Sequence, residues 1–194
     1  GYWKCNMKHG EGILKTKSGH TYEGNFVYDT FPEKIKITYP SGSKYEGDYH
    51  NNKLNGNGEM KFACGDFYKG CFQDDKMHGN GMSISVSCEI YKGKFKNNTK
   101  HGKGKQIFAN GTIYEGYFQN NKRHVNGKFT YPDGRVYEGD LKDGKMHGKG
   151  KQIFVSGDKY EGDFQNNKKH GDGKYFFADG RVYEGNWINN KYQV

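Results

Sequence analysis

The chain has 194 residues, a formal net charge of +9 and only 32% hydrophobic residues, a composition that often indicates disorder. Its 16 tyrosines and 13 phenylalanines recur at fixed intervals, however, and packed rings can form a thin, distributed core. No apolar run reaches the length of a membrane-spanning helix. The positive charge favours acidic partners such as anionic lipid, acidic protein surfaces or nucleic acid, or else it forms a solvated lysine surface.

A five-residue motif that reads tyrosine, glutamate, glycine, any residue, aromatic recurs along the chain and is clearest at Tyr160–Phe164. Successive copies begin 23 residues apart, without insertion or deletion. Their first residues are Tyr22, Tyr45, Tyr68, Tyr91, Tyr114, Tyr137, Tyr160 and Tyr183. A fixed period of about 20–50 residues is typical of repeat proteins. We number each copy from its tyrosine, which is position 0.

Two strands are predicted in each copy. Positions 0, +2 and +4 share one face of the first strand, so the tyrosine, the glycine and the aromatic residue point the same way. Glycines at +11 and +13, such as Gly171 and Gly173, mark the second strand. Asparagine-rich turns such as Asn166-Asn167 separate the two strands, and turns such as Asp133-Gly134 lead to the next copy.

A loop at +6 to +9 would place +2 opposite +13, the +4 ring opposite the +11 glycine, and +1 opposite +14. Glycine leaves room for rings to lie over the backbone. Positions +1 and +14 then form cross-strand ion pairs on the polar face. These pairs are Glu23–Lys36, Glu115–Lys128, Glu138–Lys151 and Glu161–Lys174, whereas like charges meet at Glu46–Glu59 and Lys92–Lys105.

We therefore predict an all-β open solenoid of stacked antiparallel hairpins that form an elongated twisted sheet. Residues 1–194 are interpreted as a single array of about eight repeats. The array begins and ends within a repeat, as a piece of a longer array would.

These motifs resemble the MORN (membrane occupation and recognition nexus) repeat. Residues 137–150 carry Tyr-Glu-Gly-Asp, a polar turn and Gly-Lys-Gly in the order of the family pattern, and similar copies cover essentially the whole chain. The sequence departs from the pattern near Glu33 and at Val125, where glycines are missing, and at Leu141, which replaces a ring. The resemblance implies a single-layered sheet with a grooved face, similar to the free-standing MORN scaffolds of protist, including apicomplexan, cytoskeletons.

No catalytic arrangement is predicted, and the protein is not expected to be an enzyme. Histidines recur at +10, but two strands per copy separate them by about 10 Å, too far to share one ion. They are His9, His78, His101, His124, His147 and His170. The paired glycines lack the strand-to-helix context of a phosphate loop. The four cysteines occupy four different repeat positions, which indicates no disulfide framework and favours a reducing, intracellular compartment.

One metal hypothesis remains. Cys71 at +3 and His78 at +10 are predicted to lie diagonally on the polar face of one hairpin, about 7–8 Å apart. One such pair from each of two chains would complete a tetrahedral zinc site across a two-fold axis. The alternative is a free cysteine beside a turn histidine, and no other cofactor is expected.

The primary functional prediction is a non-catalytic scaffold for protein partners in the cytoplasm, at the cytoskeleton or the inner membrane cortex, with a role in cell division or in the cortex. Solenoids present extended surfaces, and tyrosine and tryptophan rings anchor interfaces. Open sheet edges favour self-association, so we expect a homodimer that forms through the regular C-terminal copies.

The alternative function is a peripheral phospholipid-binding module. A lysine row at +14 could face an anionic membrane, but three of its members face a glutamate. The row consists of Lys105, Lys128, Lys151 and Lys174. Nucleic-acid binding is not expected, because the rings point into the core face and offer no free stacking platform.

The copy that begins at Tyr22 lacks both glycines and carries Phe31, Pro32 and Ile35 where other copies carry polar residues or glycine. Pro32 fixes φ and removes a hydrogen-bond donor, which should redirect this hairpin. Phe31 and Ile35 are then predicted to add exposed apolar surface for a partner. Two alternatives stay open: the side chains fold inward and replace lost packing, or the copy has simply drifted.

Overall fold

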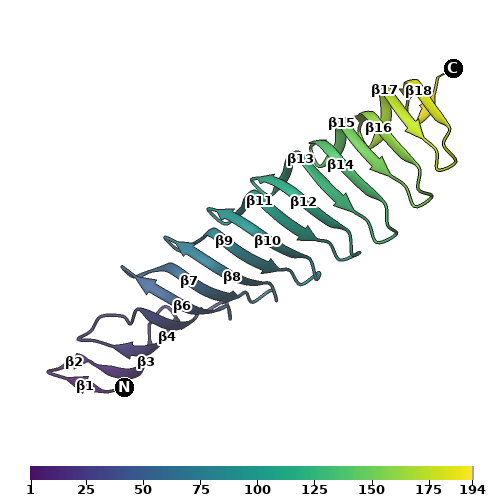
Figure 1. The fold of residues 1–194 in the computed structure, drawn as a ribbon. Helices are drawn as coiled ribbons and strands as arrows, with labels where there is room; N and C mark the ends of the chain where they lie inside the picture. The colour runs from purple at the N-terminus through teal and green to yellow at the C-terminus, as the bar shows by residue number, and fades with distance from the viewer. Residues whose placement is uncertain (194) are drawn as a thin grey trace. The chain divides into compact units, whose positions relative to one another are not determined.

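The computed structural model describes Gly1–Gln193, and its regular elements within these residues are all β-strands (Figure 1). The chain forms two compact units, Gly1–Thr99 and Lys100–Val194, which we call the N-terminal and C-terminal units. β1 and β2 pair with each other in a separate two-stranded sheet. From β3 onward, strands that follow one another within a unit pair antiparallel, so each unit is an open sheet of stacked hairpins. The predicted all-β open solenoid is confirmed.

The N-terminal unit contains β1 (Trp3–Lys4), β2 (Met7–Lys8), β3 (Gly10–Lys15), β4 (Thr21–Phe26), β5 (Lys34–Thr38), β6 (Lys44–His50), β7 (Lys53–Lys61), β8 (Phe67–Gln73), β9 (Lys76–Ile84) and β10 (Ile90–Lys96). All but the first residue of β11 (Thr99–Ile107) belongs to the C-terminal unit. This unit continues with β12 (Ile113–Gln119), β13 (Lys122–Thr130), β14 (Val136–Lys142), β15 (Lys145–Ile153), β16 (Lys159–Gln165), β17 (Lys168–Phe176), β18 (Val182–Ile188) and β19 (Lys191–Tyr192).

Each hairpin is closed by a two-residue turn at +6 and +7, which is shorter than the predicted loop. Asn166 and Asn167 have φ values of 49° and 70°, the left-handed conformation of a type I′ turn. Phe164 at +4 then pairs with Lys169 at +9, and the register shifts before +2 meets +13. The prediction that the +4 ring faces the +11 glycine of its own hairpin is therefore wrong.

Because the turn is shorter than the predicted loop, the second strand has extra residues opposite the first strand, and these form a bulge. Gly148 and Gly171, both at +11, have φ values of 62° and 64°, which suit a glycine-opened bulge. Gly148 pairs instead with Phe164, the +4 ring of the following copy. The predicted glycine–ring pairing thus occurs between neighbouring copies. The predicted pairings of +2 with +13 and of +1 with +14 are confirmed.

The motif tyrosine fills the space above the glycine pair at +2 and +13. Tyr137 is fully buried, and its hydroxyl donates a hydrogen bond to the Asp140 carbonyl at 2.7 Å. A Cβ atom on Gly150 would lie 2.7 Å from this ring. Five other tyrosines at position 0 are at most 1% exposed: Tyr45, Tyr68, Tyr91, Tyr114 and Tyr160. The glycines are needed because a ring lies against the backbone, as the sequence predicts.

Edge-to-face ring contacts join successive copies. Phe72 lies 5.2 Å from Tyr45 of the preceding copy and 5.1 Å from Tyr68 of its own, with interplanar angles of 89° and 87°. Phe164 bridges Tyr137 and Tyr160 in the same way. This geometry sets the positive edge of one ring against the negative face of the next. Each unit therefore has a core that continues from copy to copy.

The rim that carries the two-residue turns is clamped by the side chain at +7. Asn167 Oδ1 accepts a hydrogen bond from Met146 N, one copy earlier, at 2.8 Å. The same bond joins Lys8 to Asp29, Leu54 to Asp75, Met77 to Asn98, Lys100 to Asn121 and Lys169 to Asn190. Position +7 must therefore both tolerate a positive φ and accept a hydrogen bond. Gly144 meets only the first requirement.

The opposite rim, which carries the exit turns, is clamped by position +21 to the backbone N–H at +18 of the next copy. Asp158 Oδ1 accepts from Ala178 N at 2.8 Å, and Asp66 Oδ1 accepts from Val86 N at 2.9 Å. Side-chain bonds of this kind satisfy turn N–H groups that have no partner in the strand ladder. Both rims thus carry hydrogen bonds that tie neighbouring copies together.

Candidate interaction surface

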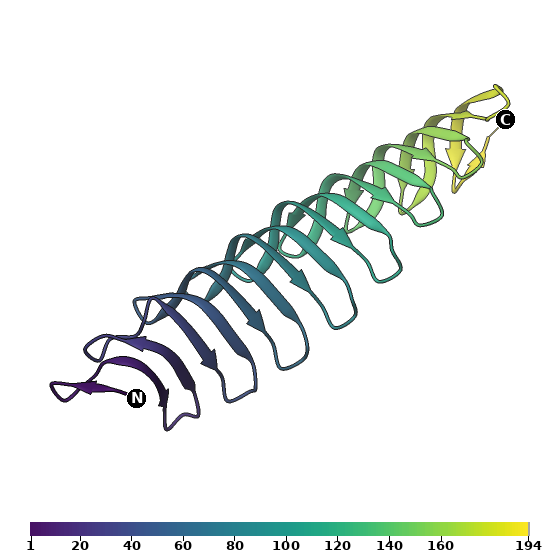
Figure 2. The ribbon, with the colours of Figure 1, turned by 60° about the horizontal axis from the view of Figure 1, so that its bottom comes forward.

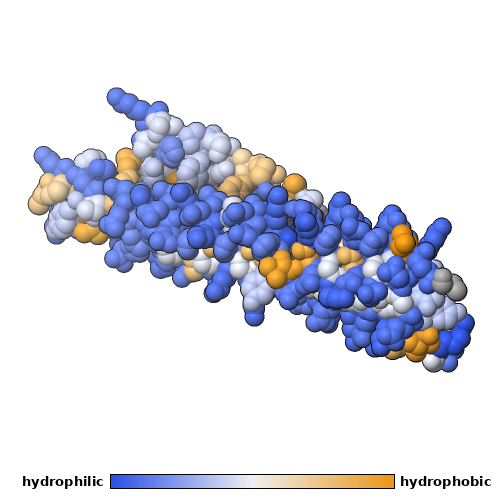
Figure 3. Space-filling model, turned by 90° about the horizontal axis from the view of Figure 1, so that it is seen from above, coloured by the Kyte–Doolittle hydropathy of each residue, from blue (hydrophilic) through white to orange (hydrophobic). Residues whose placement is uncertain are grey.

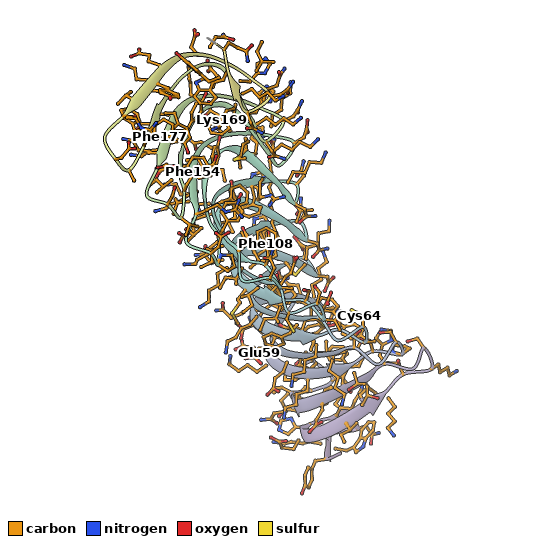
Figure 4. All side chains as sticks on the ribbon, turned by 90° about the vertical axis from the view of Figure 1, so that its right-hand side faces the viewer. Glu59, Cys64, Phe108, Phe154, Lys169 and Phe177 are labelled. Carbon is orange, nitrogen blue, oxygen red and sulfur yellow. The ribbon has the colours of Figure 1, made fainter. Side chains whose placement is uncertain are left out.

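The ring-bearing face of each unit is only partly closed. The strands curve (Figure 2), and Phe154 and Lys169 lie on the inner side of the curve (Figure 4). Rings at +17, where the exit turn begins, remain half-buried: Tyr39, Phe62, Phe108, Tyr131, Phe154 and Phe177. Accessible aromatic side chains are enriched in binding interfaces. This face is therefore the candidate interaction surface.

In the C-terminal unit, Lys169 at +9 covers part of this face. Its Nζ lies 4.4 Å from the ring centres of Tyr175 and Trp187, and 5.5 Å from those of Phe154 and Tyr160. Burial lowers the pKa of Lys169, an effect that the charge of Asp158 partly opposes. The surrounding ring faces attract the ammonium group.

Arg123 has the same position, +9, in the copy that begins at Tyr114. Its guanidinium lies 5.2 Å from the ring centre of Phe108, 5.3 Å from Phe129 and 5.9 Å from Tyr114. The rings again come from position 0, from +15 and from +17 of the preceding copy. A cation at +9 in a cage of rings is therefore a recurring element of the C-terminal unit.

A cavity of about 460 Å³ opens on the ring-bearing face of the N-terminal unit. Burial raises the pKa of Tyr39 and of Tyr49 to about 12, and the charge of Asp75 contributes to both shifts. The cavity is lined by His20, Tyr22, Ile37, Tyr39, Ser41, Ser43, Tyr49, Asn52, Leu54, Met60, Phe62 and Asp75. The sequence interpretation missed this site, although Leu54 stands at +9, where several copies have lysine or arginine, and Asp75 at +7, where most have asparagine.

The side chains of Phe31, Pro32 and Ile35 turn inward. Ile35 is 3% exposed, Pro32 is buried, and a Cβ atom on Gly24 would lie 2.7 Å from Pro32. Phe31 is half-buried and contacts Tyr22, Phe26 and Tyr49. The prediction that Phe31 and Ile35 add exposed apolar surface is therefore wrong for Ile35. Pro32 and Ile35 replace the packing lost with the glycines. Tyr22 is only half-buried, unlike the six fully buried motif tyrosines from Tyr45 to Tyr160.

The lysine row at +14 lies on the opposite, polar face. Lys128, Lys151 and Lys174 each face the +1 glutamate of their own hairpin, as predicted, but the close ion pairs of the row run to the next copy. They are Lys36–Glu46, Lys105–Glu115, Lys151–Glu161 and Lys174–Glu184, at 2.9–3.8 Å. Glu59, which faces Glu46, is compensated by Lys69 of the next copy at 2.8 Å. Lys128 is opposite Glu115 and Glu138, so a glutamate flanks every member of the row. Figure 3 shows a mainly hydrophilic surface with scattered hydrophobic patches.

Cys71 and His78 lie on paired strands, β8 and β9, beside the bulge of their hairpin. The Cys71 thiol donates to Asn57 Oδ1 at 3.4 Å, and a Cβ atom on Gly79 would lie 3.3 Å from Cys71. Within residues 1–193, no three His, Cys, Asp or Glu side chains are grouped so as to hold a metal ion. The same residues include no helix with the length and hydropathy of a membrane span. A zinc site shared between two chains stays a prediction.

Comparison with known proteins identifies the repeat. A family model described as MORN repeat matches residues 1–21, 45–67, 68–87, 91–113, 114–134, 137–159, 160–180 and 183–194. The matched segments leave out residues 22–44, the copy without the glycine pair. No curated protein sequence matches the chain significantly.

Two solved structures share the fold at low sequence identity. The TCP domain of SAS-4 (dCPAP) of Drosophila melanogaster, solved in complex with a proline-rich motif of Ana2 (dSTIL), is 12% identical, with a TM-score of 0.51, over 91% of this chain and 90% of that one. The wild-type TCP10 domain of Danio rerio CPAP is 11% identical, with a TM-score of 0.54, over 89% of this chain and 82% of that one. The family model, by contrast, matches most of the sequence, copy by copy. The chain therefore belongs to the MORN repeat family.

Proposed function

We propose that the chain is a non-catalytic scaffold that binds protein partners on its ring-bearing face. The observation that carries this proposal is the contrast between the two faces. The polar face is a ladder of compensated charges, whereas the ring-bearing face keeps a row of half-buried rings at +17 and an open cavity. Aromatic anchors in partly formed depressions contribute most of the binding energy in protein interfaces. The SAS-4 TCP domain, which shares the fold, was solved with a peptide motif of another protein.

Site-specific photocrosslinking in the source cells tests the proposal. The photoreactive amino acid p-benzoylphenylalanine replaces Phe62 or Phe154 on the ring-bearing face, and Lys128 on the polar face in a control. The replacement is conservative at the two phenylalanines because each is already an aromatic residue. Protein adducts from the first two positions but not from Lys128 are expected. Adducts from Lys128 alone would contradict the proposal.

The proposal includes a homodimer formed through the regular C-terminal copies, and a location at the cytoskeleton or the membrane cortex. Open sheet edges pair readily with a second chain. Sedimentation velocity at high micromolar concentration should show the dimer. If only a monomer is observed, the homodimer is contradicted, whereas the proposed binding of protein partners is not affected.

Direct phospholipid binding is the second candidate, since the net charge is +9. The contribution of a basic residue near an anionic membrane, about 1 kcal/mol, applies to unpaired side chains, and the lysine row is flanked by glutamates. Co-sedimentation with phosphatidylserine-containing vesicles should therefore be weak at physiological salt. Tight binding that is lost at high salt would favour the lipid function over the protein scaffold.

A further inference from the structure

The cavity of the N-terminal unit lies where the C-terminal unit places its own cations. Lys169 and Arg123, both at +9, sit among rings from position 0, from +15 and from +17 of the preceding copy. In the copy that begins at Tyr45, the residue at +9 is Leu54, and +15 is Met60. Tyr39 is the +17 ring of the preceding copy. Leu54, Met60 and Tyr39 all line the cavity, which therefore corresponds to the cation cage but is lined by no lysine or arginine.

The rim of the cavity carries a negative charge that the other cages lack. Position +7 of the following copy is Asn190 beside Lys169, whereas it is Asp75 beside Leu54. Asp75 Oδ1 accepts the clamp hydrogen bond from Leu54 N at 2.8 Å, which an asparagine could also accept. Within the described residues Asp75 forms no salt bridge; the nearby Lys53, whose pKa the charge of Asp75 helps to raise, pairs with Asp74 instead. The clamp hydrogen bond therefore requires the oxygen of Asp75 as an acceptor but does not require its negative charge.

A second aspartate at +7 shows what this charge can do. Asp29 clamps Lys8, which is the +9 residue of the preceding copy. The Lys8 Nζ atom lies 2.6 Å from Asp29 Oδ1, and it is 5.9 Å from the ring centre of Trp3. Where the rim residue is Asp29, the chain therefore supplies a cation at +9. Where it is Asp75, the +9 residue is the uncharged Leu54.

We propose that the cavity beside Asp75 binds a lysine or arginine side chain of a protein partner. This inference rests on the proposed scaffold function and names the group that the ring-bearing face recognises. The partner's cation would lie among Tyr39, Tyr49 and Phe62 and would pair with Asp75, as Lys8 pairs with Asp29. Tyrosine and phenylalanine faces attract cations, and an aspartate adds direct charge complementarity. The burial of Tyr39 and Tyr49 shields such a pair from water.

Methyl NMR of the whole chain with ¹³C-labelled methionine tests the proposal. The probes are N-acetyl-arginine methylamide and its uncharged analogue, N-acetyl-citrulline methylamide. Met60 lines the cavity, so its methyl signal should shift on titration with the arginine probe, whereas the signal of Met146 in the C-terminal unit serves as an internal control. We expect the arginine probe to bind roughly tenfold more tightly than the citrulline probe because only the first is a cation. Equal shifts with both probes, or none at Met60, would overturn the proposal.

Two variants complete the test. Asp75→Asn installs the residue that other copies carry at +7 and keeps the clamp, so the fold is retained while the preference for arginine should disappear. Leu54→Lys supplies a cation from the chain itself, as Lys169 does, and should abolish probe binding. Arginine selectivity that survives Asp75→Asn would contradict the proposal. If the Met60 signal fails to respond while Phe62 and Phe154 still crosslink to proteins, the cavity assignment fails and the scaffold function stands.

Discussion

Val125 and Gly148 occupy the same repeat position, +11, and have nearly identical φ values, 63° at the first and 62° at the second. A β-branched residue is strained in this left-handed region, whereas glycine is not. Val125 is also 53% exposed, so its side chain contributes little packing. Val125→Gly should therefore raise the free energy of unfolding by about 1–2 kcal/mol. Urea denaturation measures the change, and the free energy of unfolding of Val125→Ala should lie between those of the native protein and of Val125→Gly. An unchanged or lower stability would show that the valine is not strained.

The clamp on the turn rim can be tested within one turn. Asn167 accepts a hydrogen bond from Met146 N, whereas Asn166 has a similar positive φ and makes no side-chain bond within the described residues. Asn167→Gly should lower the free energy of unfolding by about 1 kcal/mol, because it removes the acceptor while it keeps the turn conformation. Asn166→Gly is the matched control and should change stability much less. Equal effects of the two substitutions would mean that turn flexibility, rather than the clamp, is being measured.

Gly150 is required for space and not for its conformational freedom, since it has no positive φ. A Cβ atom there would lie 2.7 Å from the ring and the hydroxyl of Tyr137, which is fully buried. Gly150→Ala should therefore destabilise the protein by about 1–3 kcal/mol, the usual cost of overpacking a core. The thermal unfolding of Gly150→Ala, Tyr137→Leu and the double variant checks the cause. The alanine should cost much less in the Tyr137→Leu background than beside the native tyrosine, and additive effects would argue against the steric explanation.

The buried tyrosines predict alkaline unfolding. Burial raises the pKa of Tyr91, Tyr114 and Tyr160 to about 12, compared with about 10 in an unfolded chain. These hydroxyls ionise first in the unfolded state, so their contribution to stability is complete below pH 10 and is lost as the pH rises towards 12. Denaturant unfolding at a series of pH values should show this decline. Tyrosinate absorbance should appear late, together with the loss of β-sheet circular dichroism. Early ionisation of all tyrosines in the folded protein would contradict the prediction.

Much of the fold could be predicted because the period of 23 residues places like residues on like faces. The tyrosine and the glycines at +2 and +13 predicted the packing of Tyr137 over Gly150, and the charges predicted the pairing of +1 with +14. The bulge was not predicted, since a glycine such as Gly148 is compatible with both an extended strand and a left-handed residue. Only the structure shows that Gly148 pairs with Phe164 of the next copy.

The candidate site was less predictable than the fold. Ile35 was assigned to the surface because it replaces a glycine, but in the structure the side chains of Ile35 and Pro32 fill the space that the glycines would leave. The proposed cation site depends on the uncharged side chain of Leu54 and on the negative charge of Asp75. These residues lie 21 positions apart in the sequence and are joined by the rim clamp. Such a pair becomes informative only when the contacts between neighbouring copies are known.

The clamps on the two rims also have an evolutionary consequence. Each joins a residue to a partner 20 or 21 positions away, in the neighbouring copy. Duplication or deletion of a 23-residue segment, starting at any point, keeps this spacing, so each clamp position again meets the matching position of a neighbouring copy. Unequal recombination between copies can therefore lengthen or shorten the gene by whole repeats while it keeps the geometry of the clamps. A single-codon insertion, in contrast, would break the clamps on both sides of the insertion.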